Sequence, residues 1–262
     1  MRFAFPLSPA LAGKTDRLSP KLERWASGID SLDATLSGGL AYGHLHELYA
    51  TEAIDMSATA GFAVALGTGM VKVGKRILWL RSYREVQLYG VLQASGWVEL
   101  GATPENFIFG LISDRKDLLR SAVDALRSNA LGAVVVETNG RFSELDMIAS
   151  RRLVLAAEKS GTPLFLIRAD AEPSASAAET RWRISSAPSR ALSGNAPGAP
   201  VFDIELLRQR SGPSGMRWQL EWDRDRRIFI DATASGALVS APLRRPAAAR
   251  DARPVRHDQR AA

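Results

Sequence analysis

Residues 45–168 alternate short apolar runs with longer amphipathic stretches, a pattern typical of βα units around a buried parallel sheet. The expected strands are the apolar runs at 45–49, 77–80, 107–109, 133–136 and 164–167. Two helical stripes lie between them, formed by Phe62, Leu66, Met70 and Val73 and by Leu119, Val123, Leu126 and Ala130. We expect each stripe to face the sheet, since both faces of a parallel sheet are normally covered by helices.

A further helix is predicted over residues 143–159. Ser143 is the candidate N-cap, because its hydroxyl can accept a hydrogen bond from a free N–H of the first turn. Gly161 follows the expected end, where glycine often adopts the left-handed conformation that terminates a helix. The fold class is therefore α/β with a mostly parallel central sheet flanked by helices.

After residue 168 the pattern changes to loops and alternating strands. The small and polar residues of 169–178 and 185–200 predict loops. Three alternating runs are expected to form an antiparallel extension, at 181–184, 201–206 and 216–222. The turn-rich residues 211–215 join the last two as a hairpin. Trp182 shares a strand face with Ile184, which favours a place in the core for its ring.

The composition narrows the class of protein. The chain has 262 residues, 46% of them apolar, which is enough for one domain with a sizeable core and two tails. It has no cysteine, which excludes thiol catalysis and cysteine metal sites. Two of the three histidines, His44 and His46, can share a strand face but lack a third ligand for a metal; the third is His257. With no apolar run long enough to span a bilayer, we expect a cytoplasmic protein without a membrane partner.

The net charge of +6 is unevenly distributed. The last residues contribute +4, through Arg244, Arg245, Arg250, Arg253, Arg256 and Arg260 against Asp251 and Asp258. Rich in Ala and Pro, residues 232–262 are expected to be a disordered basic tail. This tail is either a contact for nucleic acid or an acidic partner, or a solubilising extension. Residues 1–24 form an N-terminal extension whose prolines disfavour a long helix.

Residues 27–43 read SGIDSLDATLSGGLAYG. This segment resembles the one that precedes the phosphate-binding loop of RecA-like ATPases. The resemblance implies a RecA-like domain over residues 25–231 and places the family's nucleotide loop on residues 50–57.

That loop departs from a working phosphate loop, which needs two glycines, a lysine and a Ser or Thr. Ala50 replaces the first glycine, Asp55 the second and Met56 the lysine, and only Ser57 fits the pattern. A carboxylate about 4 Å from a phosphate charge is repelled by several kcal/mol at an effective dielectric constant of about 20. We therefore expect no ATPase activity and no cofactor.

Two more positions of the family pattern are unusual. Glu137 ends the expected strand 133–136, where it is either a carboxylate on the metal side of the site or an acid left without that role. Tyr83 falls near the position of the glutamate that activates water in RecA-like enzymes, and its phenol is not a base at neutral pH.

Further segments, at 131–137, 149–161, 178–184, 205–208 and 218–222, resemble the ImuA family. This resemblance implies a RecA-like adaptor in damage-induced (SOS) translesion synthesis. It also implies action beside ImuB, a polymerase-like protein without its own catalytic acids, and indirectly beside an error-prone polymerase. RecA is a further possible partner, for which Phe3 and Phe5 could supply anchors.

Arginines in or near the expected loops are candidate contacts for DNA or a partner. They are Arg151, Arg152, Arg181, Arg183 and Arg190, together with the arginines of the tail. Contact with DNA is expected to be weak, salt-sensitive and non-specific.

Two alternatives to the adaptor remain at this point. One is a RecA-superfamily ATPase with an unorthodox loop, which would bind Mg-ATP. The other is a cell-division inhibitor resembling SulA, although such proteins are shorter and lack the hairpin and the basic tail.

Overall fold

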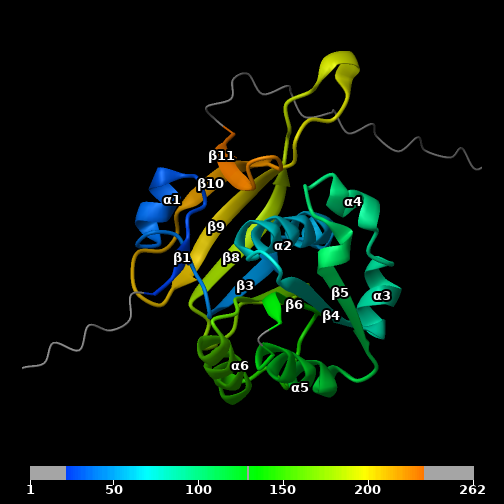
Figure 1. The fold of residues 1–262 in the computed structure, drawn as a ribbon, viewed down its shortest axis with the longest axis vertical. Helices are drawn as coiled ribbons and strands as arrows, with labels where there is room; N and C mark the ends of the chain where they lie inside the picture. The colour runs from blue at the N-terminus through cyan, green and yellow to red at the C-terminus, as the bar shows by residue number, and fades with distance from the viewer. Residues whose placement is uncertain (1–21, 129, 233–262) are drawn as a thin grey trace, which may run out of the picture.

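A nine-stranded sheet forms the centre of the molecule (Figure 1). The computed structural model describes residues 22–128 and 130–232. Along the sheet the strands follow the order β11-β10-β9-β8-β3-β7-β6-β4-β5. The six strands from β8 to β5 are parallel, which confirms the predicted mostly parallel sheet. The expected N-terminal anchors Phe3 and Phe5, His257 and the arginines of the tail lie outside the described residues.

The elements have the following bounds. The strands are β1 Arg24–Trp25, β2 Leu40–Ala41, β3 Leu45–Ala50, β4 Arg76–Ser82, β5 Phe107–Ile112, β6 Leu131–Asn139, β7 Leu164–Ala169, β8 Thr180–Ala187, β9 Val201–Gln209, β10 Arg217–Asp223 and β11 Ile228–Asp231. The α-helices are α1 Asp30–Thr35, α2 Met56–Met70, α3 Tyr83–Tyr89, α4 Ala94–Val98, α5 Arg115–Leu126 and α6 Met147–Ser160. Short 3-10 turns span Ala53–Asp55 (η1), Pro104–Asn106 (η2) and Ser193–Asn195 (η3).

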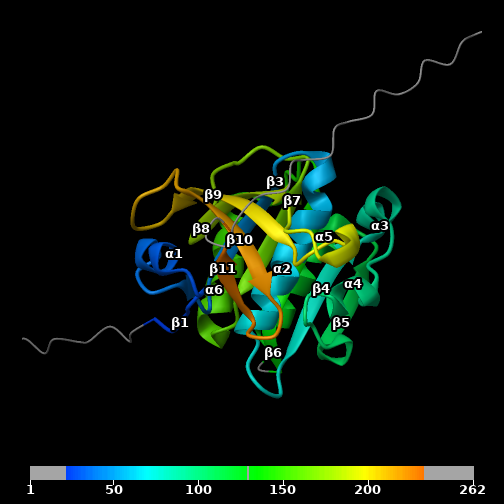
Figure 2. The same ribbon diagram turned by 90° about the horizontal axis from the view of Figure 1, so that it is seen from above.

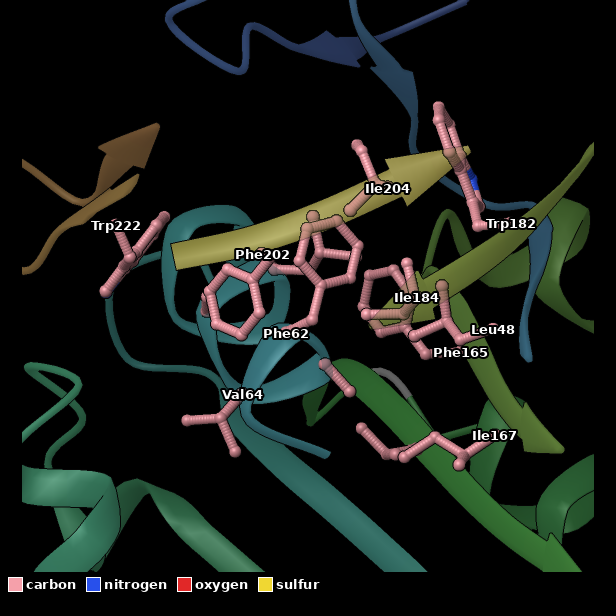
Figure 3. Packing of buried hydrophobic residues seen from close by; sticks show 14 of the residues in the cluster. Leu48, Phe62, Val64, Phe165, Ile167, Trp182, Ile184, Phe202, Ile204 and Trp222 are labelled. Atoms are coloured by element: carbon pink, nitrogen blue, oxygen red, sulfur yellow. The ribbon is translucent and has the colours of Figure 1, made fainter. Parts of the chain in front are cut away.

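Helices cover the two faces of the sheet separately. Helix α2 lies on one face, while α5 and α6 lie on the other (Figure 1). On the α2 face, Phe62 packs its ring against Phe202 of β9 at 5.4 Å (Figure 3). The ring of Phe62 also stacks on Phe229 of β11 at 5.3 Å. Trp182 lies in the same cluster at 3% exposure, as its shared face with Ile184 predicted. None of the helices within the described ranges is long and apolar enough to cross a membrane.

The C-terminal strands differ from the prediction in direction and number. Strand β8 pairs with β3 in parallel, so the antiparallel extension begins one strand later, with β9, β10 and β11. Strand β11 was not predicted. Alternation of apolar and polar residues gives the faces of a strand but not the direction of its neighbour. Figure 2 shows β10 and β11 beside α1, where Trp218 Nε1 donates a hydrogen bond to Ser31 Oγ at 3.0 Å.

Three helix boundaries also differ from the prediction. Helix α2 ends at Met70, so Val73 lies outside the stripe and is fully exposed. Helix α5 ends at Leu126, which leaves Ala130 outside as well. Asp146, not Ser143, caps α6, because its carboxylate accepts the N–H of Ala149 at 2.7 Å. The prediction for Gly161 is confirmed, with φ of 71° just after α6.

His46 lies fully buried on β3 with both ring nitrogens in hydrogen bonds. Nε2 lies 2.9 Å from the carbonyl oxygen of Ala41, and Nδ1 lies 2.7 Å from the hydroxyl of Thr180. Because a carbonyl only accepts, Nε2 carries the proton and Nδ1 accepts from Thr180. Neither nitrogen is left for a metal, so the pair His44 and His46 does not form a metal site. Burial is the main cause that lowers the pKa of His46 to about 4.

Glycines of residues 27–43 hold the N-terminal segment close to other backbone. Gly28 has φ of 95°, and a Cβ there would lie 2.6 Å from the carbonyl oxygen of Phe229. Gly39 has φ of 111° and faces the backbone of Trp25. These contacts join α1 and β1 to the sheet, so the segment has a structural role independent of any ligand.

We predict that Gly28→Ala destabilises the fold by about 2–4 kcal/mol, since it adds left-handed strain and a steric clash. Urea unfolding measures the loss. Gly74→Ala is the matched control, because Gly74 also has positive φ, 77°, but no atom within 4 Å of an added Cβ. Equal losses in the two variants would contradict the role of close packing at Gly28.

The buried His46 predicts a loss of stability in mild acid. Its folded pKa of about 4 lies below the ordinary 6.5, so the unfolded chain binds the proton more readily. The contribution is fully present above pH 6.5 and is lost as the pH falls towards 4, to a total of about 3 kcal/mol.

His46→Gln should therefore show a shallower fall in the free energy of unfolding between pH 7 and pH 4. Phe229→Leu serves as the control, because Phe229 is also buried, packs against Phe62 and Trp222 rather than against His46, and does not titrate. This control should lose stability at all pH values and keep the wild-type slope. A wild-type slope in His46→Gln would contradict the assignment.

Candidate functional site

The loop between β3 and α2 lies at the carboxyl end of the central strand, where the resemblance placed a nucleotide. Ala50 ends β3, the 3-10 turn η1 follows at Ala53–Asp55, and α2 begins at Met56. In an open α/β sheet this edge is the usual position of a ligand, next to a helix N-terminus. Residues 50–57 thus run from the end of β3 into the start of α2.

Four of the backbone N–H groups of this loop are already hydrogen-bonded within the protein. Thr51 N donates to the carbonyl of Ile184 at 3.0 Å, and Glu52 N donates to the Asp55 carboxylate at 3.3 Å. Asp55 N donates to the carbonyl of Glu52 at 3.0 Å, and Met56 N donates to that of Ala53. A phosphate cradle needs several such groups free and convergent. These four are not free.

Asp55 joins the loop to strand β8. One carboxylate oxygen accepts the backbone N–H of Ser186 at 3.0 Å and its hydroxyl at 3.2 Å. The other oxygen accepts the N–H of Glu52, and the side chain is only 6% exposed. Hydrogen bonds to a carboxylate are stronger than those between neutral groups. Asp55 therefore holds the loop against β8, the conformation that we call closed.

Met56, in the place of the phosphate-binding lysine, is buried. It is 5% exposed and belongs to the apolar cluster on the α2 face. Ser57, the remaining element of the motif, is exposed at the start of α2. The loop thus presents no cation to a phosphate.

A cavity of about 180 Å³ remains at this edge of the sheet. It is lined by residues 50–53 and 170–172, among them the carboxylates of Glu52, Asp170 and Glu172. No lysine or arginine is among these lining residues. The cavity therefore repels phosphate groups.

Glu137 lies on β6 in a buried ion pair. Its carboxylate accepts from Arg81 of β4 at 2.8 Å and from Trp79 Nε1 at 3.0 Å, and its side chain is 1% exposed. Burial raises the pKa of Glu137, and the adjacent Arg81 guanidinium opposes that shift. Because both oxygens are engaged, the geometry favours the reading of Glu137 as an internal acid rather than a metal-side carboxylate.

Tyr83 is the first residue of α3 and is 53% exposed. A different acid, which the sequence did not single out, lies two residues further on. Glu85 is fully buried and caps α3, where its carboxylate accepts the N–H of Ser82 at 3.0 Å and also the Ser82 hydroxyl. Its distance of three residues from Ser82 is a capping-box signal that could have identified it.

The predicted arginine contacts separate into two groups. Arg181 was expected near a loop but lies on β8, 8% exposed, and pairs with Glu47 at 2.7 Å. This corrects its assignment as a surface contact. Arg183 is partly buried and pairs with Glu205 at 3.1 Å. Arg151, Arg152 and Arg190 are exposed.

Two further arginines, Arg208 and Arg210 at the end of β9, were missed. They line a groove of about 510 Å³ together with Arg151 of α6. The groove joins residues more than fifty positions apart in the chain, so spacing along the sequence gives no signal for it.

The arrangement of strands and the position of the loop define a class of protein. No protein-family model matches the chain. Among solved structures, the chain is similar to the RadB recombinase, with a TM-score of 0.52 and 20% identity, over 79% of this chain and 99% of that one. At this identity the likeness shows the fold alone. The chain has the RecA-like fold.

Curated relatives give the family. Two proteins named Protein ImuA, from Caulobacter vibrioides strain NA1000 / CB15N and from strain ATCC 19089 / CIP 103742 / CB 15, are each 32% identical to the chain over 213 residues. The match covers 76% of this chain and 77% of each relative. The chain belongs to the ImuA family.

Asp55→Ala should destabilise the protein by about 1–3 kcal/mol, because the N–H groups of Ser186 and Glu52 lose their acceptor. Urea unfolding gives the loss, and amide hydrogen exchange should be faster at Ser186. Ser57→Ala, in the same segment but exposed, is the control and should stay within about 0.5 kcal/mol of wild type. Unchanged stability of Asp55→Ala would contradict the role of Asp55 in closing the loop.

Proposed function

We propose that this protein is a non-catalytic RecA-like adaptor in damage-induced translesion DNA synthesis. In this proposal it acts with ImuB, and through ImuB with an error-prone polymerase, and RecA is a second candidate partner. Membership of the ImuA family supports the process and the partners. The closed loop at Asp55 is the main observation that supports the absence of ATPase activity in this proposal.

Three properties of the loop support the absence of ATPase activity. Four of its N–H groups have acceptors within the protein, its lysine position is a buried methionine, and the lining of the adjacent cavity includes three carboxylates. Each property alone weakens phosphate binding, and they act at the same edge of the sheet. ATP would have to break the Asp55–Ser186 contact and approach three negative charges.

DNA contact, in the same proposal, is electrostatic and secondary. Residues 22–232 carry 24 Lys and Arg against 25 Asp and Glu, a net charge of −1. The positive charge of the chain therefore resides in residues 1–21 and 233–262. Binding through such charges is non-specific and weakens steeply with salt.

Calorimetry with Mg-ATP tests the non-catalytic part. We expect no binding at about 1 mM nucleotide, a concentration that detects a binding free energy of about −4 kcal/mol or more favourable. We also expect no phosphate release with or without single-stranded DNA. A RecA-like ATPase with an intact phosphate loop provides the positive control. Micromolar binding would favour the alternative of an unorthodox ATPase.

Co-purification tests the partners. The full chain should retain ImuB or RecA when each is offered as a pure protein. The Gly74→Ala variant, in which only an exposed glycine is changed, is the control and should retain the same partner. Failure of pure folded protein to retain either partner would overturn the adaptor proposal. Division arrest on overexpression would instead favour an inhibitor resembling SulA.

A further inference from the structure

A groove beside helix α6 has the size of a binding site. Its volume is about 510 Å³, within the range of about 300–1,000 Å³ typical of ligand pockets. Helix α6 forms one wall, residues 176–178 lie before β8, and the end of β9 supplies Arg208 and Arg210. Helix α6 lies on the opposite face of the sheet from α2, the helix that begins directly after Asp55 (Figure 1).

The charge of the groove stands out from the rest of the described chain. Arg151, Arg208 and Arg210 face one carboxylate, that of Glu158, while residues 22–232 together carry −1. None of the three arginines forms an ion pair with another residue in the described part of the chain. The groove is thus a local basic site whose cations are available to a ligand.

Apolar side chains flank the central arginine of this wall. Met147, Arg151 and Leu155 follow one another at intervals of four residues, which places them on one face of α6. Met147 is 44% and Leu155 is 63% exposed. A partner that fits this wall needs an acidic group between two aliphatic side chains.

The positive charge of the chain's own ends disfavours them as the occupant of the groove. Residues 1–21 carry +3 and residues 233–262 carry +4, so both have the same sign as the groove. Single-stranded nucleic acid is also a poor match, because no aromatic side chain that could stack on a base is among the lining residues. Charge complementarity and the apolar flanks favour an acidic segment of another protein.

We propose that the groove beside α6 docks an acidic, aliphatic-containing segment of a partner protein. This inference rests on the proposed adaptor function, for which it assigns a partner surface. Arg151, Arg208 and Arg210 bind the carboxylates of the segment, and Met147 and Leu155 contact its aliphatic side chains.

A designed peptide tests the proposal with the full chain. The probe is a fluorescein-labelled helical peptide of about 14 residues, the length of α6, with glutamates and leucines on one face. We expect saturable binding in fluorescence anisotropy at about 0.15 M salt, where charges beyond about 8 Å are screened. Arg151→Glu and Arg208→Glu should each weaken binding by about ten-fold or more.

Arg152→Glu is the matched control. Arg152 lies next to Arg151 on the same exposed turn of α6 but does not line the groove. Both variants change the charge equally and keep the basic ends of the chain, so non-specific attraction cancels in the comparison. Arg152→Glu should remain within about two-fold of wild type, since Arg152 does not line the groove and so contacts no carboxylate of the bound segment. Circular dichroism checks that every variant is folded.

Several outcomes would overturn the inference. They are no saturable binding to the wild-type chain, equal weakening by Arg151→Glu and Arg152→Glu, and displacement of the peptide by oligo(dT), which would assign the groove to nucleic acid. If the chain retains ImuB or RecA but does not bind the peptide, the proposal for the groove is wrong and the adaptor proposal stands. Binding of Mg-ATP would contradict the non-catalytic role but not the proposal that the groove docks a partner.

Discussion

Burial of both faces of the parallel sheet is the constraint on which the rest of the structure depends. Strands β3, β6 and β7 are almost fully enclosed, so each polar side chain on them needs a partner inside the protein. Glu47 pairs with Arg181, Glu137 pairs with Arg81, and His46 bonds to Thr180 and Ala41. Loss of one member of such an ion pair costs about 3–5 kcal/mol. Glu137, which the resemblance placed at a position associated with metal binding, is therefore held in an internal ion pair.

The strands and helices of the central layer could be predicted because burial determines their residue types. Runs such as 133–136 have to be apolar to fit between two helical layers, and this requirement is visible in the sequence. The direction of β8 depends on its pairing with the distant strand β3, which alternation does not encode. Strand β11 pairs with the preceding strand β10, and its 4 residues are too few to show a clear alternating pattern. The helix start at Asp146 is a local matter: two nearby residues, Ser143 and Asp146, can each cap a helix, and the carboxylate accepts the N–H of Ala149.

The candidate site could be predicted in part. Ala50, Asp55 and Met56 identify a loop that departs from the phosphate-binding pattern, because that chemistry demands particular residues. The contact of Asp55 with Ser186 could not be predicted, since 131 positions separate the two residues. Arg181 was misplaced for a similar reason: its partner Glu47 lies 134 positions away, and a strand arginine without a visible partner resembles a surface residue.

The burial of Met56 limits which substitutions the loop can accept. A lysine at this position would place an ammonium group in an apolar cluster unless the loop opened first, and the loop opens only if Asp55 releases Ser186. Replacement of Met56 by lysine alone, or loss of the Asp55 carboxylate alone, would thus cost stability before any phosphate contact is gained. A phosphate-binding loop at this position would require several substitutions at once, because Met56 and Asp55 are each tied into the packing of the protein.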